Sequence, residues 1–311
     1  MTVPLTPERL REHWFSRPAY PHWQYRLENL LFGLEVEYHV AQKGNHRRLF
    51  KKADFEAFVR LLKQYGYAKY ESVAHHWRVS KDTELGYIVI KPDFAFHVLE
   101  IALPPRSDLA VMTNLLNEVL QEVDSCIDDL GFERLSESFL HLNPSELELV
   151  ETARLEGYLE CLQDQARKNE FSERHFPAFM AATHVHLNVS AEEDLRLLPI
   201  LYELEWLALT LFDRTHHPPD VRSLRTLYYR NAFGNDYRLV GVPERIPFSL
   251  SEYIQQFNAS PRLFPYDPFF PVRDCSLIRP TMYGTLEFRS ACSPLKIETA
   301  GDIGTSLAQI G

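Results

Sequence analysis

The chain has 311 residues, which is long enough to bury the core of one large domain or two small ones. Its 45% hydrophobic and 24% charged residues are typical of a soluble globular protein. The formal net charge of −10, from 43 acidic and 33 basic residues, disfavours nucleic acid or an anionic membrane as a partner.

The spacing of the cysteines and the composition of the N-terminus predict the cellular compartment. The four cysteines are far apart and form no CxxC pair, which disfavours zinc ribbons and disulfide frameworks and fits a reducing cytosol. The N-terminus has no apolar segment of the kind found in secretory signals, and no run of 18 apolar residues occurs. We therefore expect a cytoplasmic protein without a membrane partner.

The first half of the chain alternates between predicted strands and helices. Residues 1–30 are rich in proline, aromatic and charged residues and form an N-terminal extension with a short helix over 7–14. Gly66 and the pair Pro104-Pro105 act as stop signals for a helix and a strand. The predicted elements are a strand over 34–40, a helix over 54–65, and strands over 67–79 and 86–103.

Helices dominate the middle of the chain. Apolar residues recur at helical spacing over 108–130, with Ser107 as a possible cap and Gly131 as the end. Asn143-Pro144 is a helix-start signal, and we expect that helix to run to about residue 168. A strand over 183–190, an apolar helix over 192–212, long loops over 214–283 and a last strand over 284–291 follow. This mixed order favours an α+β fold.

Four of the predicted strands carry polar side chains where a half-buried strand should not tolerate them. Side chains alternate between the two faces of a strand. In LEVEYHV (34–40), Glu35, Glu37 and His39 therefore share one face, opposite apolar residues. The segments HVLEIAL (97–103), THVHLNVS (183–190) and GTLEFRSA (284–291) place their own carboxylates, histidines, Asn188 and Arg289 in similar patterns. A sheet with one apolar face and one acidic, histidine-bearing face results.

Crowded carboxylates repel one another unless cations neutralise them. Oxygen ligands with some imidazole suit Mg²⁺ or Mn²⁺, so the polar face is a candidate metal site. Each strand alone has a simpler explanation, because a solvent-facing strand with charges outside is common. The joint pattern of four strands favours the metal site.

The motifs GLEVEYH, PDFAFHVLEIAL, HVHLNVS and GTLEFRS, in this order, resemble the metal-binding strands of the glutamate–cysteine ligase family. That family belongs to the glutamine synthetase-like carboxylate–amine ligases, and the resemblance covers roughly residues 31–295. It implies a single catalytic domain over 1–311 in which a curved antiparallel sheet, a half-barrel flanked by helices, holds ATP with two or three Mg²⁺ (or Mn²⁺) ions. The implied metal ligands are Glu35, Glu37, Asp93, Glu100, His186 and Glu287.

The resemblance also implies residues that contact the substrates. Arg289 matches an arginine that contacts phosphate or substrate, and Arg238 is a further candidate for contact with phosphate. Arg225 matches an arginine that grips the α-carboxylate of glutamate, and Asn188 lies beside the ligand His186. Asn231 stands where the family has an aromatic substrate contact, so the amine acceptor is left open.

The predicted activity is an ATP-dependent carboxylate–amine ligase that forms a γ-glutamyl or related amide bond through an acyl phosphate, with amino-acid substrates. No P-loop motif occurs, so metal ions and arginines would have to bind the phosphates. Two alternatives remain open at this point: an amide hydrolase on the same scaffold and a non-catalytic nucleotide-binding sensor. The oligomeric state is not predicted.

Overall fold

The computed structural model describes residues 31–73, 76–84, 86–150, 175–188, 197–212, 227–228, 231–232, 245–259, 278–280 and 285–292, together with Thr6, Glu8 and Glu160. Ten strands form one sheet in which every pairing is antiparallel. The strands are β1 (Phe32–Gln42), β2 (Asn45–Leu49), β3 (Lys69–Val73), β4 (His76–Thr83), β5 (Gly86–Pro92), β6 (Val98–Arg106), β7 (Phe132–Arg134), β8 (Ala182–Asn188), β9 (Ile278–Pro280) and β10 (Thr285–Cys292).

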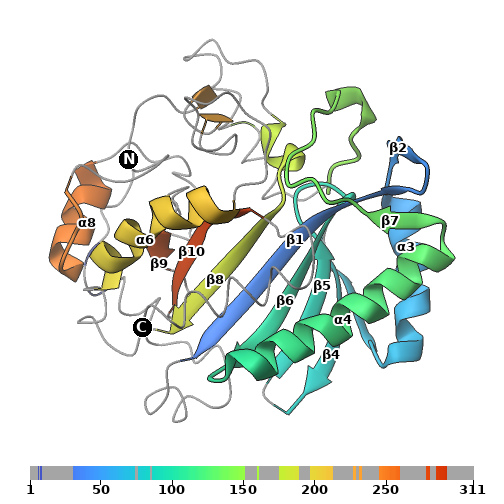
Figure 1. Ribbon diagram of the computed structural model, residues 1–311, viewed down its shortest axis with the longest axis horizontal. Helices are drawn as coiled ribbons and strands as arrows, with labels where there is room; N and C mark the ends of the chain where they lie inside the picture. The colour runs from blue at the N-terminus through green and yellow to red at the C-terminus, as the bar shows by residue number, and fades with distance from the viewer. Residues whose placement is uncertain are drawn as a thin grey trace.

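The sheet is open. Its strands lie in the order β3–β4–β5–β6–β1–β8–β10–β9, and β2 and β7 pair with the far end of β1 (Figure 1). In the part of the chain that the structure describes, β3 and β9 are the two ends of this order and do not pair with each other. The expected α+β class with an antiparallel sheet is confirmed at this level. β1 lies at the centre, between β6 and β8.

In the part of the chain that the structure describes, four helices flank the sheet: α3 (Lys52–Leu62), α4 (Leu109–Asp129), α6 (Leu197–Phe212) and α8 (Leu250–Ala259). The turn η1 (Lys63–Tyr65) extends α3, and Gly66 ends it with a left-handed φ of 86°. α4 is capped by Asp108 rather than Ser107, because the Asp108 carboxylate accepts hydrogen bonds from the backbone N–H groups of Ala110 and Val111. Pro199 lies in the first turn of α6, where its missing N–H is not needed.

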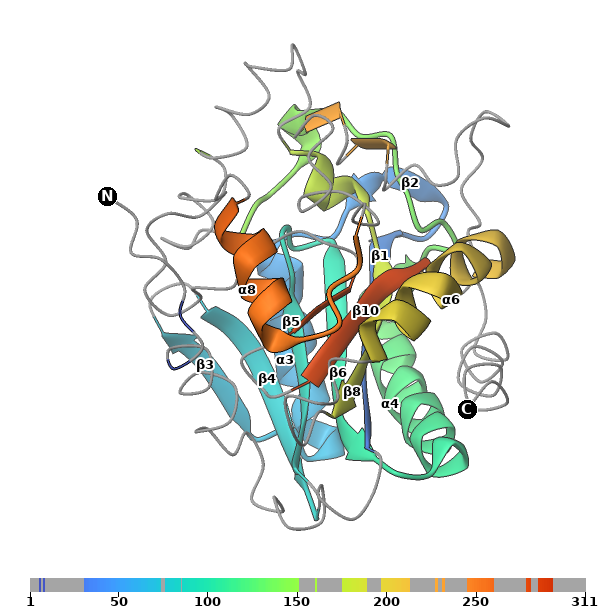
Figure 2. The same ribbon diagram turned by 90° about the vertical axis from the view of Figure 1, so that its left-hand side faces the viewer.

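The apolar face of the sheet is the core. Val36, Tyr38 and Val40 of β1 pack in one large cluster with buried residues of α3, α4, β4, β5 and β6. Val185 of β8 and the apolar side chains of β10 pack with residues of α6 and α8 in a second cluster, and Leu34 touches both clusters. Figure 2 shows α4 and α6 on the same side of the sheet. The predicted alternation is therefore confirmed: the apolar side chains of β1, β8 and β10 face the helices.

The first part of the helix expected from Asn143 is wrong. Over the described residues up to 150, only a single turn forms, η2 (Pro144–Glu146), although Asn143 caps it as expected. Residues 148–150 are instead extended, because they pair with the 94–96 segment through the bonds Phe96 N–H to Glu148 O and Val150 N–H to Phe94 O. The rest of that expected helix lies largely outside the described residues, as does the helix expected over 7–14.

The prolines Pro104 and Pro105 do not stop their strand, since β6 continues to Arg106. They lie where the register between β1 and β6 shifts, and at such an irregularity a missing backbone N–H costs no regular ladder bond. The two longer strands expected over 67–79 and 86–103 are each divided, into β3 and β4 and into β5 and β6.

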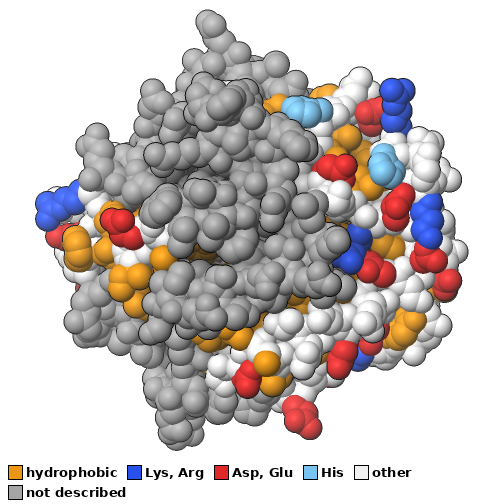
Figure 3. Space-filling model, in the orientation of Figure 1, with side chains coloured by type: hydrophobic (Ala, Val, Ile, Leu, Met, Phe, Trp, Pro, Cys, Tyr) orange, Lys and Arg blue, Asp and Glu red, His pale blue; other side chains and the backbone are white. Residues whose placement is uncertain are grey.

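The surface over α3, α4 and β7 mixes both signs of charge (Figure 3). Ion pairs join Arg48 to Asp54, Lys43 to Asp128, and Arg134 to Asp124. Such pairs leave no large field of one sign on this part of the surface. Among the described residues, no helix is both long enough and apolar enough to span a bilayer.

Candidate metal and substrate site

The polar face of the central strands brings the predicted acidic and histidine residues together. The antiparallel register sets Glu37 of β1 opposite Glu100 of β6, and Glu35 of β1 opposite His184 of β8. On the next pair of strands, His186 and Glu287 are partners across β8 and β10. Because these side chains lie opposite the core residues, burial of the apolar face fixes which residues reach the polar face.

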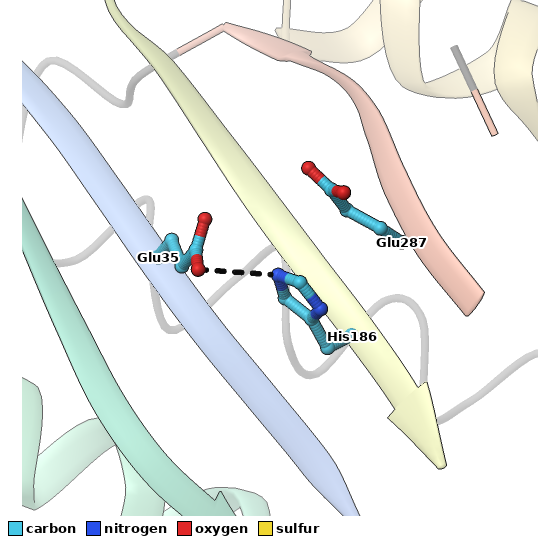
Figure 4. A group of neighbouring side chains, drawn as sticks. All are labelled: Glu35, His186 and Glu287. Carbon is cyan, nitrogen blue, oxygen red and sulfur yellow. Dashed lines mark ion pairs between the residues drawn. The ribbon is translucent and has the colours of Figure 1, made fainter. Parts of the chain in front are cut away.

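The first cluster, here called the histidine group, consists of Glu35, His186 and Glu287. One ligand atom from each of the three lies within 4.8 Å of the others. The Nε2 of His186 lies 3.5 Å from a carboxylate oxygen of Glu35, as Figure 4 shows. Two carboxylates and one imidazole at this separation can converge on a single divalent ion.

His184 lies at the centre of the carboxylates. Its Nδ1 is 3.3 Å from Glu35 and 3.5 Å from Glu287, while its Nε2 is 3.8 Å from Glu37. A single imidazole therefore faces acids from β1 and β10. The sequence places His184 on the polar face but does not mark it as a ligand, because strand sequences alone do not reveal which neighbours will converge on a side chain.

Three further contacts hold the site in place. The Oγ1 of Thr285 lies 3.0 Å from Nδ1 of His186, which orients the ring so that Nε2 points to Glu35. The backbone N–H of Ala182 donates a 2.8 Å hydrogen bond to Glu37. A Cβ at Gly33 would lie 3.2 Å from that of His186, so a larger residue there would press on His186 and displace it by a few tenths of an ångström.

The second cluster, here called the lysine group, consists of the carboxylates of Glu37, Asp93 and Glu100. Their ligand atoms also lie within 4.8 Å of one another, and Asp93 is the only exposed member of the three. Lys91 of β5 is the register partner of Glu100, and its Nζ lies 3.0 Å from the buried Glu100 carboxylate. The sequence does not reveal that Lys91 faces these acids, because the register between β5 and β6 depends on the irregular 93–97 connection.

The two groups differ in how they hold charge. Burial disfavours the ionised form of Glu35, but His186, His184 and Lys91 outweigh burial and hold the pKa of Glu35 well below its usual value. Burial raises the pKa of Glu100 well above its usual value; Lys91 counteracts this, but the acids at Glu35, Asp93 and Glu37 add to it. A carboxylate that is costly to ionise in the metal-free protein is one that a divalent cation would stabilise.

The other predicted site residues are placed as follows. Arg289 shares the polar face with Glu287, and its Nε lies 3.2 Å from that carboxylate. The side-chain oxygen of Asn188 accepts a 2.7 Å hydrogen bond from the backbone of Leu31, so it fixes the start of β1 against the end of β8. Arg225 and Arg238 lie outside the described residues. The roles of all ten residues in binding or catalysis remain predictions.

The chain was compared with known proteins at the level of sequence and of structure. No protein-family model matches it, and neither does any curated protein sequence. Its fold is similar to the crystal structure of a bifunctional glutathione synthetase from Pasteurella multocida, with a TM-score of 0.52 and 17% identity over 92% of this chain and 39% of that one.

A second similar structure is a glutamate–cysteine ligase from Francisella tularensis in complex with AMP, with a TM-score of 0.49 and 14% identity. That match covers 85% of this chain and 61% of the ligase. The present chain thus spans less than two thirds of either protein. At these identities the likeness to the synthetase concerns the fold, an antiparallel α+β arrangement that extends over most of this chain.

Proposed function

We propose that this chain is an ATP- and metal-dependent carboxylate–amine ligase that forms a γ-glutamyl or related amide bond between amino-acid substrates. One observation carries the proposal: the six ligands expected from sequence fall into two compact groups on one face of the sheet. These six side chains come from β1, β6, β8, β10 and the bend after β5. The fold likeness to a glutathione synthetase adds support.

The residues of both groups fit divalent ions. Carboxylates dominate, and in the lysine group the buried Oε1 of Glu100 already faces a cation, the ammonium of Lys91, at 3.0 Å. When bound, the ions would neutralise the triphosphate and the charge that spreads over the transferring phosphoryl group. The second imidazole, His184, among the acids of the histidine group favours Mn²⁺ as well as Mg²⁺.

The protein's own groups would bind and orient the substrates. Arg289, held against Glu287, would contact the transferring phosphoryl group, with Arg238 in the same role. Arg225 would hold the carboxylate of the amino acid, and Asn188 would also contact the substrate. A carboxylate activated as an acyl phosphate can then be attacked by the amine, provided that both substrates are held close together and water is excluded. In this proposal, residues 31–295 form a glutamine synthetase-like half-barrel within a single catalytic domain.

The test is release of ADP from ATP with Mg²⁺ or Mn²⁺ and pooled amino acids, followed by mass spectrometry of the products. A ligase yields ADP together with a new mass that equals two substrates less water. Formation of amide-cleavage products without use of ATP would instead identify an amide hydrolase. Metal-dependent binding of ATP without turnover of any amino acid or amine would identify a nucleotide sensor, and the proposal would be wrong.

A further inference from the structure

Lys91 is the one cation of the described polar face that lies against the lysine group. Its register partner on β6 is Glu100, and the register partner of Glu100 on β1 is Glu37. The three residues therefore lie side by side across β5, β6 and β1. A lysine ammonium is charged at neutral pH, and the carboxylate 3.0 Å away favours that charge.

The ammonium lies against a carboxylate of the proposed metal site. Nζ of Lys91 lies 3.0 Å from Oε1 of Glu100. A divalent ion that binds this oxygen at roughly 2.0–2.1 Å would therefore lie close to the ammonium in its present position. The two cations would also repel each other across a largely buried space.

The exposure of Lys91 and Glu100 would allow a metal ion to replace the ammonium beside the Glu100 carboxylate. Glu100 is only 3% exposed, whereas the side chain of Lys91 is 38% exposed. A lysine has a long flexible stem, so the ammonium can turn away into water while the carboxylate stays in place.

We propose that Lys91 is a built-in counter-ion of the lysine group that competes with a divalent cation for Glu100. In the metal-free protein, the ammonium of Lys91 stabilises the buried carboxylate of Glu100. A metal ion binds to the lysine group only when the ammonium moves away. The lysine group therefore binds its ion more weakly than its three carboxylates alone would. This inference rests on the metal binding assumed in the proposed function.

The comparison residue is Lys81 of β4. Its Nζ lies 2.7 Å from Glu122 of α4, and its side chain is 31% exposed, similar to Lys91. Glu122 belongs to neither of the two ligand groups. Lys81→Met thus removes an equivalent lysine–carboxylate pair without touching the proposed site.

The experiment is a titration of the protein with Mn²⁺ in the absence of nucleotide, in which electron paramagnetic resonance measures free Mn²⁺. Lys91→Met should tighten one Mn²⁺ site by about tenfold or make an additional site measurable. Lys91→Gln should give the same gain if the methionine variant fails to fold, whereas Lys91→Arg, which keeps the cation, should behave like the wild type. Lys81→Met should leave the affinity unchanged.

A second substitution locates the effect. In the Lys91→Met background, Glu100→Gln should abolish the gain, because the competition concerns that carboxylate. Unchanged or weaker Mn²⁺ binding in the Lys91 variants, or a gain that survives Glu100→Gln, would overturn the role of Lys91 and leave the metal site intact. If no variant binds Mn²⁺, both this inference and the metal site of the proposed function are wrong.

Discussion

The polar face of β1 has two ends that differ sharply, although the same alternation produces both. At one end lie Glu35 and Glu37, which belong to the two groups of ligand atoms close enough to hold a cation. At the other end lies His39, which stacks on His97 from the turn before β6, with ring centroids 5.5 Å apart. Both histidines are almost fully buried.

The segments that cover the histidine pair account for the difference. The backbone of Leu135 donates to His39 O, and the segment that contains η3 (Phe176–Phe179) places Ala178 O 2.9 Å from Nε2 of His97. A bridge between Phe139 and Met180 joins the two covering segments. Backbone segments thus cover one end of this face, here called the closed end, whereas the end with the carboxylates is here called the open end. The sequence of the strand does not reveal which end is covered.

The largest effect should follow from removing charge at the open end. Glu287→Gln keeps the size of the side chain but removes a carboxylate that faces His184, His186 and Arg289. We expect ligase turnover to fall by about a thousandfold with little change in unfolding temperature. Glu133→Gln on β7, where the carboxylate pairs with His46 at the surface, is the matched control and should keep full activity. Equal activity of Glu287→Gln and wild type would remove Glu287 from the site.

The closed end should instead control stability. Burial lowers the pKa of His97 from 6.5 to about 4, although the bond to Ala178 counteracts this. In the unfolded chain His97 gains a proton near pH 6.5, whereas the folded protein does not until about pH 4. The neutral ring therefore contributes stability above pH 6.5 that is lost as the pH falls towards 4.

The shift corresponds to a loss on the order of 3 kcal/mol in the free energy of unfolding between pH 7 and pH 4. Urea unfolding across this range measures it, with His97→Gln as the comparison, because Gln can still donate to Ala178 O but does not titrate. The variant should lose less stability than the wild type on acidification. Parallel pH profiles of the two proteins would show that His97 is protonated in the fold as easily as in the unfolded chain.

Glu37 lies at the boundary between the two ends and should combine both kinds of effect. Its carboxylate accepts the N–H of Ala182 and also belongs to the lysine group. Glu37→Ala should cost about 2 kcal/mol of unfolding free energy, because it leaves a buried backbone N–H without an acceptor. Glu37→Gln keeps an acceptor oxygen and should cost less than half of that, yet lose turnover as fully as the alanine variant. Equal destabilisation by both would mean that the bond to Ala182 contributes little.

Much of this arrangement could be predicted from the alternation of residues along β1, β8 and β10. In those strands a continuous apolar face must be buried. Because side chains alternate between the two faces of a strand, the acids must then lie together on the opposite face. The end of α3 at Gly66 and the end of α4 near Gly131 were predicted for a similar reason, because both signals are local.

What the sequence could not reveal depends on partners distant in the chain. The extended segment 148–150 pairs with 94–96, and this pairing overrides the strong helix-start signal at Asn143. His184 and Lys91 each appeared as ordinary strand residues; their proximity to several carboxylates depends on which strands are neighbours and on the register between them. The closure over His39 is of the same kind, since it comes from residues about 100 and 140 positions later.

The smallest effect should come from Gly33, where the open end depends on the distance between two strands. Gly33→Ala would place a Cβ 3.2 Å from Cβ of His186, so His186 must shift by a few tenths of an ångström. The substitution also stiffens the unfolded chain, which offsets the crowding, and we expect the free energy of unfolding to change by less than about 1 kcal/mol.

Metal binding should be more sensitive than stability to this shift, because Nε2 of His186 must meet the carboxylates of Glu35 and Glu287. We expect Mn²⁺ affinity at the histidine group to fall by about fivefold, which titration of free Mn²⁺ measures. In a His186→Ala background the same change at Gly33 should have no effect on affinity, since the ring it displaces is gone. A loss of affinity that persists in that background would mean that Gly33 acts on the backbone of β1 and Glu35 rather than through the imidazole. The open end would then depend on the position of one strand, and His186 would be replaceable as its ligand.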